Sequence, residues 1–172
     1  MLGLLAYYDI SNDKQVLNAA IKMTDHLIKQ LKDSGKSIVK TGNYRGMPSS
    51  SFLEPVMFLY NRTGEDRFLS FAKYIVQEWE TPDGPQLISK ALEDIPVSQR
   101  FPSPATWWSW DNGQKAYEMM SCYEGLLELY KVTGNPLYMS VVEKSVANII
   151  KEEINIAGSG SALECWYGGS AK

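Results

Sequence analysis

A glutamate near the end of the sequence has the surroundings expected of a proton-transferring residue. Glu164 lies between the glycine- and serine-rich stretch 158–161 and the aromatic pair Trp166 and Tyr167. Apolar neighbours raise the pKa of a carboxyl group, and a raised pKa suits a general acid. The alternative is an ordinary loop glutamate in solvent. No second carboxylate stands at a spacing that would identify a catalytic partner for it.

Aromatic side chains gather where a sugar ring could be bound. Trp107, Trp108 and Trp110 fall in a long loop before a predicted helix, and Tyr167 follows the glutamate. Indole rings can lie against the apolar faces of sugars, but they also close hydrophobic cores beneath loops, so both interpretations stay open. Together with Gln114, near the start of that predicted helix, these residues are the candidate substrate contacts.

A stripe of acidic residues runs along the predicted helix 113–132. Glu118, Glu124 and Glu128 recur on one face of this otherwise apolar segment. In a ring of helices the stripe would face a central cavity, whereas in a simple bundle it would form a solvated edge.

The other reactive side chains argue against further chemistries. His26, the only histidine, lies near the polar face of an amphipathic helix, so a Ser-His-Asp triad is unsupported. Cys122 falls on an apolar segment and is expected to be a small buried residue. Cys165 alone supports neither a zinc site nor a nucleophile. We therefore expect neither cysteine to bind a metal in this chain.

Three similar segments, which begin at Tyr8, Tyr60 and Tyr130, indicate a repeated helical hairpin. Each has a Ser or Thr three residues later and then a Gly or Asn, which tolerates the left-handed conformation at a helix end. Apolar residues at helical spacing predict helices at 14–32, 52–61, 66–80, 113–132 and 136–154. The expected core includes Leu17, Ala20, Leu59, Leu69, Ala72, Ile75, Leu127, Val142 and Ile149.

Enclosed helices alternate with amphipathic ones, which favours two concentric layers in an α/α toroid. The repeats are unequally spaced, and the extra residues fall in long loops of the kind that carry function. Two local signals are weaker. Ser51 and Glu54 form a candidate capping box, and residues 37–40 hint at a short strand.

Length and charge bound the function. The 172 residues carry a net charge of −3, which argues against nucleic-acid binding, and no apolar run is long enough for a membrane span. About seven residues precede the first turn and a glycine-rich loop ends the chain, so we expect residues 1–172 to be a single fragment of about three hairpins, truncated at both ends. Faces left uncovered in this way favour a homo-oligomer.

Four segments resemble one subgroup of the β-L-arabinofuranosidase family, glycoside hydrolase family 127: residues 46–55, 79–85, 115–130 and 154–160. The resemblance implies an (α/α)6 toroid, about half of it present here, and a retaining mechanism with a Glu acid/base and a zinc-bound Cys nucleophile. The family's acid/base follows a glycine-rich loop and precedes aromatic and glycine residues, as Glu164 does. The family's nucleophile and zinc ligands lie further downstream, so the resemblance implies no cofactor within this chain.

The sequence also departs from the family. Better-studied members have histidines near the start of the second hairpin and in a Gly-His before the third, where this chain has Ser49-Ser50-Ser51 and Gly113-Gln114. The sugar specificity is therefore expected to differ. The leading hypothesis is a fragment of a glycoside hydrolase acting on glycans and silent by itself. The alternatives are a helical-hairpin interaction scaffold and another six-hairpin sugar enzyme, such as a lyase or an epimerase.

Overall fold

The computed structural model describes residues 1–101, 115–160 and 164–168. These ranges are built from helices, and their only β-type pairing is an isolated backbone bridge between Lys115 and Cys165. The all-α prediction is therefore confirmed. Within the same ranges, every helix is too short or too polar to cross a membrane.

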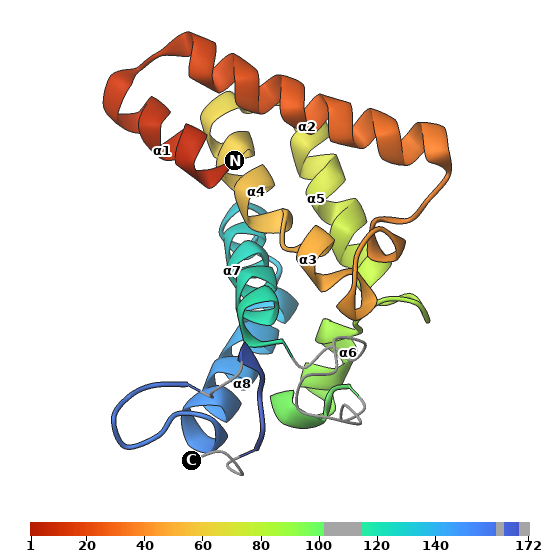
Figure 1. Ribbon diagram of the computed structural model, residues 1–172, viewed down its shortest axis with the longest axis vertical. Helices are drawn as coiled ribbons and strands as arrows, with labels where there is room; N and C mark the ends of the chain where they lie inside the picture. Colours follow the sequence, from red (N-terminus) through yellow and green to blue (C-terminus); the bar gives the residue numbers. More distant parts are fainter. Residues whose placement is uncertain (102–114, 161–163, 169–172) are drawn as a thin grey trace.

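Three antiparallel helix pairs form the body of the molecule (Figure 1). They are α1 (Leu2–Ser11) with α2 (Lys14–Ser34), α4 (Leu53–Thr63) with α5 (Asp66–Trp79), and α7 (Ala116–Thr133) with α8 (Pro136–Glu152). Helix α4 contacts both α1 and α7, so the first helices of the three pairs form one row. Helices α2, α5 and α8 form the other layer, as expected for part of an α/α toroid.

Each pair is joined by the predicted tight turn. Asn12, Gly64 and Gly134 follow α1, α4 and α7 with φ of 54°, 67° and 66°, the left-handed conformation that ends a helix. The side chains of Asp13 and Asn135 then accept hydrogen bonds from backbone N–H groups and start the next helix. The short turns of the second and third pairs lie at one end. We call the opposite end, where α5 and α8 finish and α4 and α7 begin, the loop end (Figure 1).

Two local predictions are wrong. The segment expected to hint at a strand is a 3-10 turn, Ile38–Lys40, which Ser37 caps by accepting a hydrogen bond from Val39 N. The capping box does not form, because α3 (Met47–Ser50) directly precedes α4 and the Ser51 hydroxyl donates to the carbonyl of Pro48 at 2.7 Å instead. Phe52 is the N-cap of α4. Helix α6 (Leu87–Leu92) was not predicted.

The core runs through all three pairs. Seven of the nine predicted core residues are buried, and the other two, Leu69 and Leu127, are partly buried against the main cluster. Helices α4 and α7 approach so closely that a Cβ atom at Gly125 would lie 2.6 Å from the backbone nitrogen of Glu54. The expected enclosure of α7 is incomplete, because Tyr117 and Met120 are exposed.

Candidate active site

Glu164 lies at the loop end, beside the first turn of α7. Its Oε2 atom is 3.5 Å from Nζ of Lys115, the residue immediately before this helix. The Glu164 side chain is 58% exposed, whereas that of Lys115 is only 8% exposed. The apolar enclosure expected from the sequence is thus not what surrounds this carboxylate among the described residues. A buried ammonium group faces it instead.

Lys115 keeps its charge despite being buried. Its Nζ lies 5.6 Å from the centre of the Tyr44 ring, a distance at which the ring face attracts a cation. Burial disfavours the ammonium, but Cys165, Tyr44 and Glu164 together raise the pKa of Lys115 above its ordinary value. Lys115 was not among the residues predicted for the site. Its place near the start of the predicted helix 113–132 was the one available signal.

The two cysteines do not form a metal site with their described neighbours. Cys122 is fully buried in α7, as predicted, and burial raises the pKa of its thiol far above the ordinary value. Burial also raises the pKa of the Cys165 thiol, which disfavours the thiolate that binds metals. No cluster of three or more His, Cys, Asp or Glu side chains suited to a metal occurs in the part of the chain that the structure describes. These residues therefore do not fit the zinc that the family resemblance implies.

A groove lies beside the start of α4, and α7 reaches it through Ser121. The groove has a volume of about 640 Å³ and is lined by residues of α1, α2, α3, α4 and α7 and of the segments between them, among them Ser49, Ser51, Glu54 and Ser121. Burial, Glu124 and Glu128 raise the pKa of Glu54 above its ordinary value. Glu124 and Glu128 thus act on Glu54, the acidic residue that lines the groove. At the C-terminal end of the α7 stripe, Glu128 Oε1 forms an ion pair with Lys131 Nζ at 2.5 Å.

One turn before Ser121, Glu118 connects the groove with the surroundings of Glu164. Its charge acts on the titration of both Tyr44 and Cys165, so its carboxylate lies near these two side chains. Its Oε2 is buried and accepts no hydrogen bond from the described residues. The α7 stripe thus links the groove to the Lys115–Glu164 pair along one face of the helix.

The remaining predicted contacts divide into two groups. Trp107, Trp108, Trp110 and Gln114 lie outside the described residues. Tyr167 is described: it is partly buried, its hydroxyl oxygen is buried, and burial raises the pKa of its phenol. Among the predicted site residues, Glu164 and Tyr167 are described by the structure. They lie three positions apart in one segment at the loop end. His26 is exposed, as expected.

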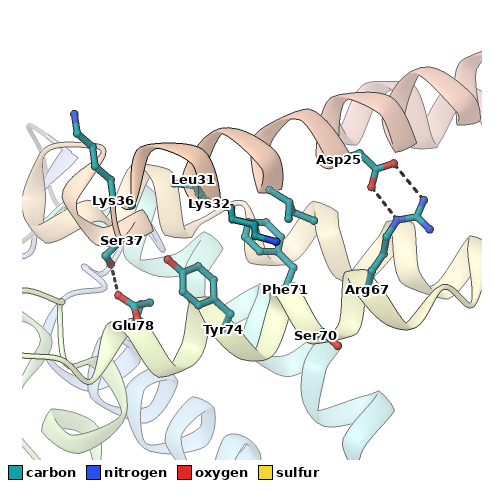
Figure 2. A pocket seen from close by; sticks show the side chains of 12 residues that line it. Asp25, Leu31, Lys32, Lys36, Ser37, Arg67, Ser70, Phe71, Tyr74 and Glu78 are labelled. Atoms are coloured by element: carbon teal, nitrogen blue, oxygen red, sulfur yellow. Dashed lines mark hydrogen bonds and ion pairs between the residues drawn. The ribbon is translucent and has the colours of Figure 1, made fainter.

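A second groove lies elsewhere, between α2 and α5 in the outer layer (Figure 2). Its volume is about 740 Å³, and Phe71 and Tyr74 of α5 form part of its wall. The ion pair between Asp25 and Arg67 and the hydrogen bond from Ser37 to Glu78 join the two walls (Figure 2). Neither Glu164 nor Lys115 lines this groove.

Comparison with known proteins agrees with the helical architecture. Residues 1–167 match the family described as the β-L-arabinofuranosidase, GH127 catalytic domain. No match is found among curated proteins or among solved structures. The family match covers the three hairpins and the segment that carries Glu164.

Proposed function

Because the chain belongs to the GH127 β-L-arabinofuranosidase catalytic-domain family, we propose that it takes part in glycoside hydrolysis with Glu164 as the general acid/base. The observation that carries the proposal is the position of this carboxylate, exposed at the loop end and 3.5 Å from the buried ammonium of Lys115. Family membership favours this enzyme over an interaction scaffold.

Glu164 has two tasks in this mechanism. As an acid it donates its proton to the glycosidic oxygen while that oxygen leaves the anomeric carbon and the nucleophile implied by the family resemblance bonds to the same carbon. As a carboxylate it then takes a proton from the water molecule whose oxygen replaces the nucleophile at the anomeric carbon. Lys115 stabilises the negative charge that Glu164 acquires when it gives up its proton. The described residues do not fit a zinc site, and the proton transfers assigned here belong to Glu164, with Lys115 beside it.

The sugar is proposed to reach the groove beside α4 and α7. Ser49 and Ser51 line this groove at the positions where better-studied members of the family have histidines. Hydroxyl groups are smaller than imidazoles and carry no charge, so the sugar bound here would differ in size or in hydrogen-bonding pattern. Arabinofuranose is thus one of several pentoses and hexoses to be compared as substrates.

The test is the Glu164→Gln variant, made in the protein encoded by the complete reading frame and assayed with aryl and alkyl β-L-arabinofuranosides. We expect kcat/KM to fall about 10²- to 10⁴-fold, the usual range for a general acid. The loss should be larger for the methyl glycoside than for the p-nitrophenyl glycoside, because only the poor leaving group needs protonation.

The matched control is Glu143→Gln, which changes an exposed glutamate of α8. It should leave both substrates unaffected. A Glu164→Gln enzyme that retains full activity on both glycosides would refute the catalytic assignment. If the unsubstituted protein is inactive on arabinofuranosides but active on another glycoside, the substrate assignment changes and the role of Glu164 does not.

A further inference from the structure

Two glutamates at the loop end make the same unusual contact in successive hairpins. Glu80 ends α5, and its two carboxylate oxygens accept hydrogen bonds from the backbone N–H groups of Ile88 and Ser89, both at 3.0 Å. Glu153 ends α8, and its oxygens accept from the N–H groups of Tyr167 and Gly168 at 2.9 and 2.8 Å. Helices α5 and α8 therefore each finish in a carboxylate that binds two successive amides of the chain that follows.

The two contacts hold different segments. The Glu80 contact starts helix α6, since Ile88 and Ser89 lie in its first turn. The Glu153 contact holds residues that lie only three and four positions after Glu164. Glu153 is 3% exposed, so its carboxylate is removed from water and depends on these two amides.

The segment between Glu164 and Gly168 is fixed at further points. The backbone of Cys165 pairs with that of Lys115, and Trp166 is buried in the main core. Gly168 has φ of 62°, and a Cβ atom there would lie 2.9 Å from Oγ of Ser98. The direction of the Glu164 side chain thus follows from how this short segment is anchored.

We propose that Glu153 is a positioning residue, which holds the 164–168 segment so that the carboxyl group of Glu164 stays beside Lys115. The role rests on the proposed function of Glu164. Glu153 itself does not touch the sugar: it acts through two backbone hydrogen bonds. Loss of the anchor lets the acid/base move away from its working position, and a displacement of about 1 Å can lower a rate about 100-fold.

Amide hydrogen exchange tests the anchor directly and needs no substrate. In Glu153→Gln, one carboxylate oxygen becomes an NH₂ group, which cannot accept from a backbone N–H. We expect exchange at one of the two amides, Tyr167 or Gly168, to become at least tenfold faster, with Ile88 and Ser89 unchanged. Glu80→Gln is the matched control and should give the reverse pattern. Unchanged exchange at Tyr167 and Gly168 in Glu153→Gln would overturn the anchor.

Activity then separates positioning from a general loss of structure. Glu153→Gln should lower kcat on the methyl glycoside by about ten- to 100-fold. Added to Glu164→Gln, it should cause almost no further loss, because the group that it positions is already gone. An equal loss in both backgrounds would overturn the positioning role.

Two outcomes keep the hypotheses distinct. Full activity of Glu164→Gln would refute the proposed function and with it the positioning role, while the exchange measurement would still report on the anchor. If Glu153→Gln does not fold, Gly168→Ala disturbs the same segment and leaves the Glu153 side chain intact, because Gly168 has a left-handed backbone and its added Cβ would contact Ser98. Gly168→Ala should lower kcat on the methyl glycoside, and it should cause almost no further loss when it is combined with Glu164→Gln. An unchanged kcat, or an additive loss, would overturn the proposal.

Discussion

The crossing of α4 and α7 gives the sharpest stability prediction. A methyl group at Gly125 would lie 2.6 Å from the backbone nitrogen of Glu54 and 2.8 Å from Cγ of Leu53. The backbone cannot move aside without shifting α4, so the cost should be near the upper end of the range for overpacking, about 3 kcal/mol. Alanine regains about 1 kcal/mol through its better helix propensity. Gly125→Ala should therefore lower the free energy of unfolding by about 2 kcal/mol.

Thermal and urea denaturation, followed by circular dichroism at 222 nm, measure this change. For a chain of this size, about 2 kcal/mol corresponds to a Tm lower by about 4–8 °C. Gly3→Ala is the matched control, because it also replaces a glycine in a helix but meets no atom within 4 Å. It should leave stability unchanged or raise it by up to about 1 kcal/mol, the gain in helix propensity alone. A Gly125→Ala protein as stable as the parent would show that the helices are further apart than described.

Two further predictions concern charge and assembly. The pKa of Glu54 is raised, so its ionisation costs stability as the pH rises from the ordinary value of this carboxyl group through the raised one. Glu124→Gln removes part of that cost, and urea unfolding should find the variant about 0.5 kcal/mol more stable at pH 7 but not at pH 3, where Glu54 is protonated. The same gain at both pH values would contradict this. Ile10 on α1 and Ile150 on α8 are 87% and 64% exposed, and we expect self-association through these apolar faces. Sedimentation velocity should find less of it in an Ile10→Asp, Ile150→Asp double variant, and a monomeric parent at high concentration would refute the idea.

The regular part of the fold was predictable because its signals are local. Helical spacing of apolar residues located five helices to within a few residues, and Gly64 and Gly134 marked the turns through their left-handed backbone. Short elements were missed for the opposite reason. Residues 37–40 have the composition of a strand, but the Ser37 hydroxyl caps a 3-10 turn. Helix α6 has only six residues, too few for a periodic pattern.

The site was predictable only in part. Glu164 could be singled out from its flanking glycines and aromatics. Its pairing with Lys115 joins residues 49 positions apart, and no local pattern reports such a contact. The Glu153 contact spans 14 and 15 residues and depends on where α8 ends. Leu127 was placed in the core by its spacing but is only partly buried, because it belongs to the incompletely covered side of α7.

The opposition between the short turns and the loop end has a practical consequence for attaching the protein to a surface. The chain has two cysteines, and only Cys165 is partly exposed, next to Glu164. Coupling through native thiols would therefore fix the molecule with its loop end against the support, where large molecules cannot approach it. Replacing Cys165 by serine and placing a cysteine at exposed Asp66, beside the turn between α4 and α5, would invert the orientation. A surface built in this way would present the loop end of every molecule to the solution.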